Sequence, residues 1–297
     1  MSAPIRVIQA DVFTTRPFAG NPAAAVLEAD GLDEAVLPRI ADELRVAGTA
    51  FVSAPRAGDA DWRLRMFTPT LEVAYSGHTA LCATHALVEA GRVPGARVAY
   101  ETPAGPLRVD VERGDGAVLM WLEPPTPALI PDDERLEEIL TALGLPAAGL
   151  AAWAGPAVTP DRDLLLPVRD LATLRALTPD MRRLAALRSA AGARGVCCVS
   201  RETIEPASST HCRFFAPHYG LPEDLVTGSV HSPMAVWLLE AGALDARGGR
   251  AAFTAEQGDG LGRPGRLRIE VIVTAGRASR VRVGGHAVTV RSGSLRA

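Results

Sequence analysis

Two segments of this chain carry the same helix-ending pattern at the same spacing, and this repeat limits the folds that the chain can adopt. Ser76-Gly77-His78 is followed by Leu87-Val88-Glu89-Ala90-Gly91, and Thr227-Gly228-Ser229 by Leu238-Leu239-Glu240-Ala241-Gly242. Fourteen positions separate the first glycine from the last in each copy. Glycine after a helix is common by itself. The strand-like runs before both copies instead indicate an internal duplication.

Both repeated segments predict helices, from Gly77 to Ala90 and onward from Gly228, that have no polar face. A helix of this kind is buried on most sides. Strand-like runs outnumber helices around each segment, so we expect an α+β fold of two similar domains, each a curled β-sheet or barrel wrapped around a central helix. No G-x-G-x-x-G follows the first strand, which argues against a nucleotide-binding Rossmann fold.

A cluster of prolines, Pro124-Pro125-Thr126-Pro127, is the best candidate for a linker, because proline disrupts both helices and central strands. We therefore expect one domain over residues 1–123, joined by a C-terminal strand at about 285–297. The second domain is expected over 130–284. Further helices are predicted from Asp33, as N-cap, to about Arg45, at about Glu134 to Leu143, and near Pro179 to Ala191.

The charges exclude some partners. The chain has 31 basic and 34 acidic side chains with no run of like sign, which makes nucleic acid an unexpected partner. The chain has no stretch of about 18 apolar residues that would predict a membrane span, and its N-terminal residues show no signal-peptide pattern. We therefore expect a cytoplasmic protein.

The four cysteines have no C-x-x-C spacing and are expected to be buried, without a disulfide framework.

The starts of the two central helices are the candidate binding sites. A helix that opens with Ser-Gly or Thr-Gly presents unpaired backbone N–H groups and a positive dipole end. Two such ends facing a cleft between the halves would hold a small anion. His78 in the first turn of one helix and Asp224 just before the other could move protons there, although a capping role is the alternative for each.

A metal site is not expected. His78, Cys82 and His85 share one face of the first helix, but the second copy has Ser229, Pro233 and Val236 at the corresponding positions. A thiol-based racemase is also disfavoured, because Ser76 and Thr227 stand where it would need cysteines.

Three motifs together resemble the phenazine biosynthesis PhzF-like family, which is related in fold to diaminopimelate epimerase. They are the N-terminal hairpin Asp11-Val12-Phe13 with Arg16-Pro17-Phe18-Ala19-Gly20-Asn21-Pro22, the segment from Phe67-Thr68-Pro69 to Ser76-Gly77-His78-Thr79, and the segment from Phe215-Ala216-Pro217 to Glu223-Asp224-Leu225-Val226-Thr227-Gly228-Ser229.

The resemblance implies a homodimeric isomerase that shifts a double bond in a small unsaturated carboxylic acid and needs no cofactor or metal. It implies roles for Asp224 and His78 in proton transfer. It also implies substrate binding by Asn21, Ser76, Gly77, Thr227, Gly228 and Ser229. Isomerases of this kind are associated with biosynthesis, including that of alkylproline-type antibiotic precursors.

One residue departs from the family pattern. Gly48 in Val46-Ala47-Gly48-Thr49-Ala50-Phe51 stands where the family has its principal glutamate base. Losing a positioned base costs roughly 10²- to 10⁴-fold in rate. The reaction of the phenazine pathway itself is therefore not expected, and the space left at Gly48 is expected to admit a larger substrate or a water.

The leading hypothesis is a cofactor-independent isomerase or tautomerase acting on a small unsaturated carboxylic acid or cyclic amino acid of a specialised biosynthetic pathway, with Asp224 and His78 sharing the proton transfer. A non-catalytic carboxylate-binding protein is the first alternative. A racemase or epimerase with unusual bases is the second.

Overall fold

The computed structural model describes residues 4–56, 58–114, 116–131 and 135–296. The chain forms two compact units. Unit 1 comprises Met1–Glu123 and Gly284–Ala297, and unit 2 comprises Pro124–Val283. Within the described ranges, no helix has the length and apolar character needed to cross a membrane.

Unit 1 contains helices α1 (Leu37–Leu44) and α2 (Gly77–Glu89). Its strands are β1 (Ile5–Val12), β2 (Asn21–Val26), β3 (Gly48–Ser53), β4 (Trp62–Phe67), β5 (Glu72–Val73), β6 (Arg97–Thr102), β7 (Gly105–Arg113), β8 (Val118–Leu122) and β18 (Ala287–Leu295). β1 pairs with β18 and β2, β3 runs parallel to β2 and antiparallel to β4, and β6 runs parallel to β4.

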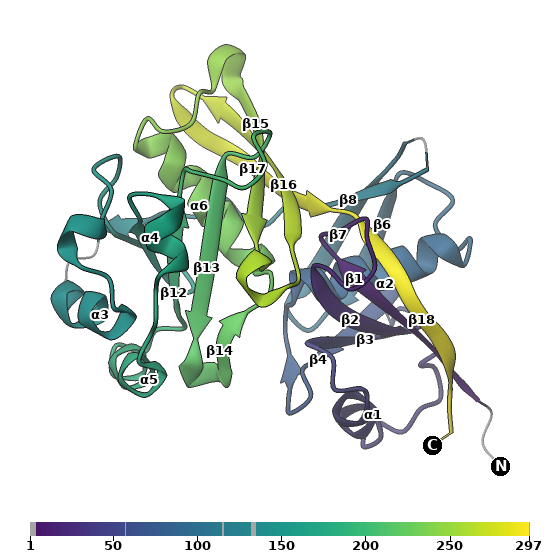
Figure 1. The fold of residues 1–297 in the computed structure, drawn as a ribbon. Helices are drawn as coiled ribbons and strands as arrows, with labels where there is room; N and C mark the ends of the chain where they lie inside the picture. The colour runs from purple at the N-terminus through teal and green to yellow at the C-terminus, as the bar shows by residue number, and fades with distance from the viewer. Residues whose placement is uncertain (1–3, 57, 115, 132–134, 297) are drawn as a thin grey trace. The chain divides into compact units, whose positions relative to one another are not determined.

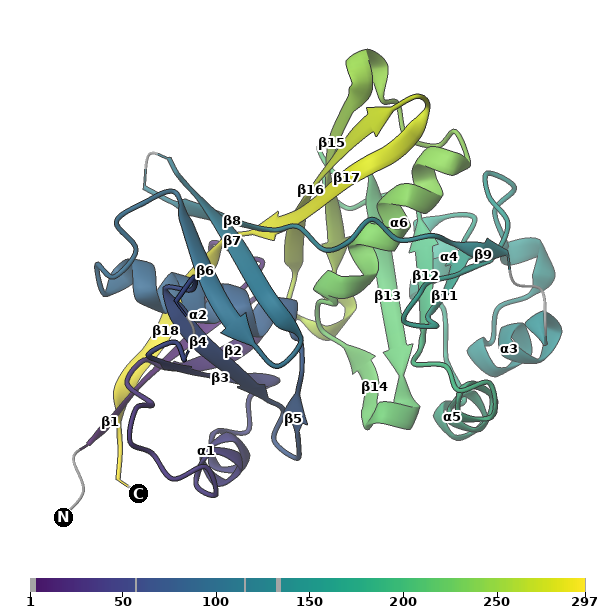
Figure 2. The ribbon, with the colours of Figure 1, turned by 180° about the vertical axis from the view of Figure 1, so that it is seen from behind.

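Helix α2 is the centre of unit 1. Its residues from Thr79 to Leu87 are all buried. The helix packs against β1, β2, β3, β4, β8 and β18, so strands enclose it on several sides (Figure 1, Figure 2). The apolar pattern of the sequence follows from this enclosure, because no side of the helix faces water along its middle turns.

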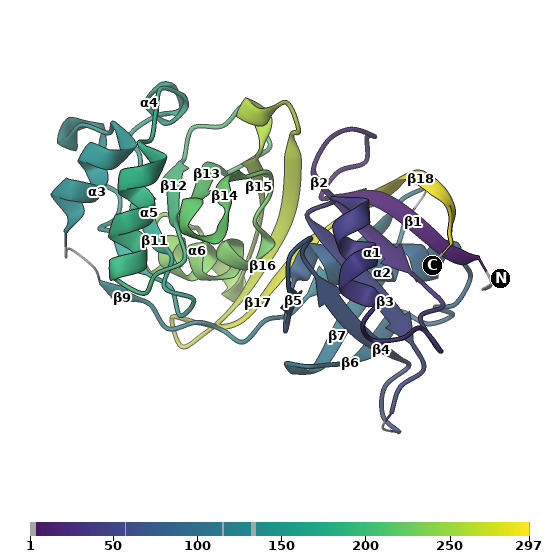
Figure 3. The ribbon, with the colours of Figure 1, turned by 90° about the horizontal axis from the view of Figure 1, so that it is seen from below.

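Helix α1 starts later than the sequence suggested. It begins at Leu37, with Val36 as its N-cap and a proline in its first turn. Asp33 instead shapes the preceding turn, where its side chain accepts a hydrogen bond from Ala35 N at 2.9 Å. Proline suits a first helical turn because that position needs no N–H donor. The apolar face of α1 packs with β3 on the side away from α2 (Figure 3).

Unit 2 contains helices α3 (Leu136–Leu143), α4 (Leu171–Arg175), α5 (Met181–Ala190) and α6 (Gly228–Glu240). Its strands are β9 (Ile130–Pro131), β10 (Ala157–Val158), β11 (Leu164–Pro167), β12 (Val196–Ser200), β13 (Thr210–Ala216), β14 (Leu221–Asp224), β15 (Arg250–Gln257), β16 (Gly265–Thr274) and β17 (Arg277–Gly285), which ends at the border of unit 1. The short helix α4 was not expected, and Glu134, the expected start of α3, lies outside the described residues.

One core of unit 2 joins β11 and β12 to three helices. Leu164, Val196 and Cys198 pack with α3, α4 and α5 in one cluster. On α6, the residues from Val230 to Leu238 are all buried. α6 therefore has the same all-round burial as α2, as its sequence predicted.

The pairing of strands repeats between the units. In unit 1 the order is parallel β2–β3, antiparallel β3–β4, parallel β4–β6 and antiparallel β6–β7. In unit 2 the same order holds for β11–β12, β12–β13, β13–β15 and β15–β16. In the sequence, α2 lies between β4 and β6, and α6 lies between β13 and β15. Each helix thus falls between the two strands of the second parallel pair of its unit. The predicted α+β fold with two similar halves is confirmed.

The hairpin loop before β2 should depend on Gly20. Its φ is +61°, and an added Cβ would lie 2.1 Å from the carbonyl oxygen of Val12. Gly31 has a φ of +79° but no atom near an added Cβ. We expect Gly31→Ala to cost about 1 kcal/mol from backbone strain alone. Gly20→Ala should cost several-fold more, because the Val12 backbone must also move. Thermal unfolding of both variants tests this, and equal losses would contradict it.

Candidate functional site

The N-terminus of α2 is not capped by a side chain. Ser76 is the N-cap, with extended backbone, and its hydroxyl does not bond to the backbone N–H groups of the first turn. The first N–H groups of a helix have no partner inside the helix and lie at the positive end of its dipole. This end of α2 therefore suits a negatively charged group.

The Ser76 hydroxyl instead joins a small cluster of side chains. Its Oγ lies 2.8 Å from Thr79 Oγ1 and 3.3 Å from His78 Nδ1. Thr79 Oγ1 lies 3.5 Å from His78 Nε2. The imidazole of His78 is thus held at the start of α2 by the hydroxyl groups of Ser76 and Thr79, one before it and one after it in the sequence.

Gly48 is the first residue of β3 and lies against this cluster. A Cβ added to it would lie 2.0 Å from Thr79 Oγ1 and 3.0 Å from His78 Nε2. The side chain of Thr79 therefore fills the space next to Gly48. The expectation that this space admits a larger substrate or a water was wrong, because α2 supplies a side chain that occupies it.

The N-terminus of α6 has the same uncapped geometry, with Thr227 as the N-cap. The Thr227 hydroxyl donates a hydrogen bond of 2.7 Å to Asp224 Oδ2. Asp224 is the last residue of β14 and lies three residues before this N-cap. The neighbouring Glu223 is held by Arg213, which donates to both of its carboxylate oxygens at 2.8 Å.

Gln257, at the end of β15, fixes the segment between Asp224 and α6. Its Nε2 donates to the carbonyl oxygen of Asp224 at 3.0 Å and to Thr227 Oγ1 at 3.1 Å. Its Oε1 accepts from Thr227 N at 2.9 Å. No local sequence pattern marks Gln257 as a site residue, because its partners lie about 30 positions away.

The residue before Gln257 anchors β15. Glu256 is fully buried and accepts hydrogen bonds from His211 Nδ1 at 2.9 Å and from the backbone N–H groups of Ile204 and Glu205, both at 2.8 Å. Burial by itself raises the pKa of this carboxyl, but these hydrogen bonds lower it to about 2.

Arg194 is a second residue that no local sequence pattern marks, because its partner Ser229 lies 35 positions away. It lies two residues before β12, and its Nη2 donates to Ser229 Oγ at 3.0 Å. Its guanidinium also binds both oxygens of the buried Asp163. Burial alone would lower the pKa of Arg194, but the hydrogen bonds and charge of Asp163 raise it. The start of α6 therefore carries a permanent positive charge next to Ser229.

Asn21, which the family resemblance assigned to substrate binding, is the first residue of β2 and pairs with Val12. Its side chain is buried. The loop before it is held by a hydrogen bond of 2.7 Å from Phe18 N to Asp11 Oδ2.

The three residues that share one face of α2 have separate environments. Cys82 is fully buried, which raises the pKa of its thiol to about 12. His85 Nε2 lies 3.0 Å from Thr289 Oγ1 and 3.3 Å from the carboxylate of Glu89. Among the residues that the structure describes, no group of three or more histidine, cysteine or acidic side chains is placed to hold a metal ion.

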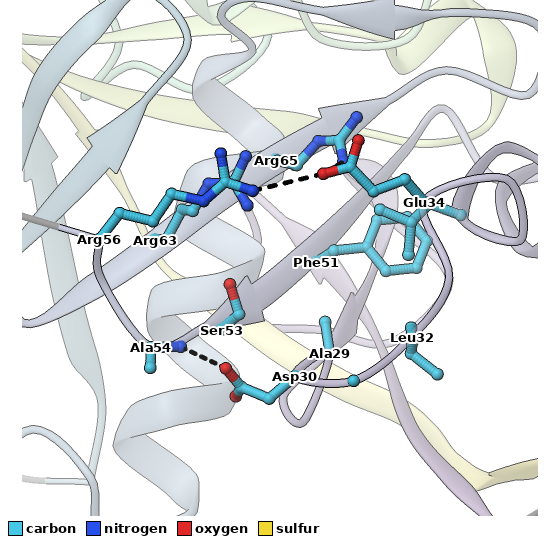
Figure 4. Close-up of a pocket in the computed structure, with 12 residues that line it drawn as sticks. Ala29, Asp30, Leu32, Glu34, Phe51, Ser53, Ala54, Arg56, Arg63 and Arg65 are labelled. Atoms are coloured by element: carbon cyan, nitrogen blue, oxygen red, sulfur yellow. Dashed lines mark hydrogen bonds and ion pairs between the residues drawn. The ribbon is translucent and has the colours of Figure 1, made fainter.

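A separate cavity of about 300 Å³ lies on the α1 side of unit 1 (Figure 4). Phe51 and Leu37 line it, and Arg56, Arg63 and Arg65 stand at its rim. Glu34 lies 3.4 Å from Arg56 and 3.3 Å from Arg65, so acidic partners balance the arginine charges. None of the predicted site residues lines this cavity.

The whole chain is similar to known proteins. A model of a family described as phenazine biosynthesis-like protein (PhzC-PhzF) matches residues 10–293. An uncharacterized isomerase of Deinococcus radiodurans is 34% identical over 302 residues, covering 97% of this chain and 94% of that protein. The uncharacterized isomerase YddE of Escherichia coli K12 is 32% identical over 290 residues, covering 95% of each protein.

Solved structures agree with this comparison. A PhzF family protein of Bacillus anthracis superposes with a TM-score of 0.89 at 26% identity, over 100% of both chains. A hydroxyproline epimerase of Agrobacterium vitis gives a TM-score of 0.58 at 15% identity, over 98% of this chain and 92% of that one. The second likeness concerns the fold alone and agrees with the epimerase-like architecture.

The contact between Gly48 and Thr79 can be measured with a double-mutant cycle. We expect Gly48→Ala to destabilise unit 1 by about 1–3 kcal/mol, because the new methyl group overlaps Thr79 Oγ1. In a Thr79→Ala background most of that loss should disappear. Equal losses in both backgrounds, measured by denaturant unfolding, would show that Thr79 does not fill the space.

The buried carboxylate of Glu256 predicts a dependence of stability on pH. Its pKa in the folded chain is about 2, below the ordinary 4.5, so its stabilisation is present above pH 4.5 and is lost as the pH falls toward 2. We expect Glu256→Gln to be less stable than the natural chain by about 3 kcal/mol at pH 7. The difference should shrink below pH 4.5.

The exposed Glu240 provides the control, because its replacement by glutamine should change little at any pH. Unfolding free energies at several pH values test the prediction. A difference between Glu256→Gln and the natural chain that stays constant down to pH 2 would contradict it.

Proposed function

The chain belongs to the phenazine biosynthesis-like family, and from that premise we propose that it is an isomerase that moves a proton between carbon atoms of a small unsaturated carboxylic acid or cyclic amino acid. Relatives that match almost the whole chain are named isomerases, which supports this reaction class. We assign the reaction to a specialised biosynthetic pathway, and cyclic imine amino acids are the first substrates to test.

The observation that carries the proposal is the fixed carboxylate of Asp224. Thr227 donates a hydrogen bond to its Oδ2, and Gln257 holds the backbone on both sides of the segment. A carboxylate at the end of a strand, held next to the uncapped start of α6, is positioned to exchange a proton with a substrate whose negative group binds at that helix start.

The proposed reaction conserves all atoms and electrons. Asp224 removes a proton from one carbon, the freed electron pair shifts along the unsaturated system, and a proton returns to another carbon, so that the double bond moves. His78 is the second proton-transferring group in this proposal. Its imidazole suits the task because histidine titrates near neutral pH, and the hydroxyls of Ser76 and Thr79 fix its ring.

Gly48 restricts which substrates can react. Without the usual glutamate, a substrate that needs that base should react roughly 10²- to 10⁴-fold more slowly. We therefore propose a substrate whose C–H bond is more acidic than that of the phenazine-pathway acid, such as one activated by a conjugated imine.

Gly48 also favours one alternative, a protein that binds small carboxylates without transforming them. Such a protein would keep both uncapped helix starts and would have no need for the glutamate. It would bind carboxylates with an affinity that does not depend on proton transfer by Asp224.

Isotope exchange separates the two functions. In D₂O, the isomerase should place deuterium on carbon of a cyclic imine amino acid or a small diene acid, detected by NMR or mass spectrometry. Asp224→Asn should slow this incorporation at least ~10²-fold, because a positioned base is lost. Glu223→Gln is the matched control, since Arg213 holds that neighbouring carboxylate elsewhere, and it should retain the exchange.

Turnover of a substrate without deuterium on carbon would end the proton-transfer proposal. Asp224→Asn with the exchange rate of the natural chain would remove Asp224 from it. Saturable binding of these acids with no exchange and no turnover would favour the binding protein.

A further inference from the structure

The internal duplication shows which positions of the two units correspond. Thr49 of β3 lies opposite Phe67, and Val196 of β12 lies opposite Phe215. Gly48, the first residue of β3, therefore corresponds to Gly195, the residue before β12. The residue before each glycine is Ala47 in unit 1 and Arg194 in unit 2. Likewise, His78 and Ser229 are the second residues of α2 and α6.

The starts of α2 and α6 therefore carry different polar groups at equivalent positions. At α2 the imidazole of His78 lies beside Gly48, and Ala47 offers only a methyl group. At α6 the smaller Ser229 hydroxyl accepts a hydrogen bond from Arg194. The duplication has thus placed a guanidinium where unit 1 has no equivalent charge.

The Arg194 guanidinium is held rigidly from two sides. Asp163, with 1% of its side chain exposed, binds its Nε and Nη2. The ring of Phe214 lies 5.4 Å from its central carbon, in a cation–π contact that fixes the plane of the group. A side chain fixed in this way loses little entropy when it binds a ligand.

Donor capacity remains on this guanidinium. Its Nη1 makes no hydrogen bond within the described part of the chain, and 27% of the side chain is exposed. Nη1 carries two N–H groups, and guanidinium N–H groups form strong, directional hydrogen bonds with carboxylates. Besides Asp163, the carboxylate of Asp161 lies 3.7 Å from Nη2, and the charges of Asp161 and, more weakly, Asp224 also act on Arg194.

We propose that Arg194 determines specificity by holding the substrate's carboxylate at the start of α6, together with the backbone N–H groups of that helix. This inference rests on the proposed function and narrows the substrate class. The substrate must carry a carboxylate close to the carbon from which Asp224 takes the proton. Neutral amides or esters of the same ring should bind poorly.

The test compares an acid with its uncharged analogue. Calorimetry should measure binding of pyrrole-2-carboxylate and of pyrrole-2-carboxamide to the natural chain, Arg194→Gln and Arg194→Lys. Replacing Arg194 by glutamine should weaken binding of the carboxylate by ~10- to 100-fold, the range expected for a charge-assisted hydrogen bond. Binding of the amide should change less than about twofold, and lysine should restore part of the loss.

Two further variants separate binding from folding. Arg194→Gln leaves the buried Asp163 without its partner, so the same comparison is made with Asp163→Asn/Arg194→Gln, which removes both charges. Arg65→Gln is the matched control. Arg65 binds both oxygens of Glu72 at 2.7 Å and lies 5.4 Å from the ring of Phe67, as Arg194 does from Phe214. Its loss should leave the affinity for the carboxylate unchanged.

The outcomes distinguish this inference from the proposed function. Unchanged carboxylate binding in both Arg194 variants, equal weakening for acid and amide, or no carboxylate binding by the natural chain would overturn the role of Arg194. Deuterium exchange by the natural chain would leave the isomerase proposal standing in each case. Conversely, Arg194-dependent binding without exchange would support Arg194 and count against the isomerase. With an active substrate, Arg194→Gln should raise KM and leave kcat within a few-fold.

Discussion

A helix that is apolar on every side must be enclosed, and this requirement shapes both units. Strands pack around α2 in unit 1, and α6 is buried along its middle turns in unit 2. A polar side chain along such a helix needs a partner inside the core, as Thr84 of α2 has in the carbonyl oxygen of Ala80 and the hydroxyl of Tyr100. At the N-terminal ends, neither Ser76 nor Thr227 caps the backbone with its side chain. The same enclosure that builds the core therefore leaves two helix N-termini able to attract an anion.

The two units share one arrangement of strands and a central helix, but they carry different polar side chains at the starts of α2 and α6. In unit 1, the Thr79 side chain fills the space beside Gly48, and the His78 imidazole lies next to it. In unit 2, Thr227 and Gln257 hold Asp224, while Arg194 bonds to Ser229. Proton transfer and the binding of a charged group need different side chains. The internal duplication supplies two equivalent positions for them, at the starts of α2 and α6. The packing of Thr79 beside Gly48 thus leaves no room for a larger side chain at that position.

The sequence predicted those features that depend on local pattern. The fourteen-residue spacing, the apolar composition of both central helices and the strand-closing Phe67 and Phe215 anticipated the repeated topology that the structure shows. Features that depend on distant partners were missed or misread. Gln257 and Arg194 were missed because their partners Thr227 and Ser229 lie 30 and 35 positions away in the sequence. The filling of the space at Gly48 by Thr79 likewise follows from how α2 lies on β3, which spacing alone does not define.

The binding of a carboxylate by the backbone N–H groups at the start of α6 can be tested directly. Amide NMR of the natural chain, titrated with pyrrole-2-carboxylate, observes these groups. We expect a saturable shift of the Gly228 amide signal, with no comparable change on addition of the neutral carboxamide. Saturable shifts confined to other parts of the chain, with the Gly228 amide signal unmoved, would rule out this binding site.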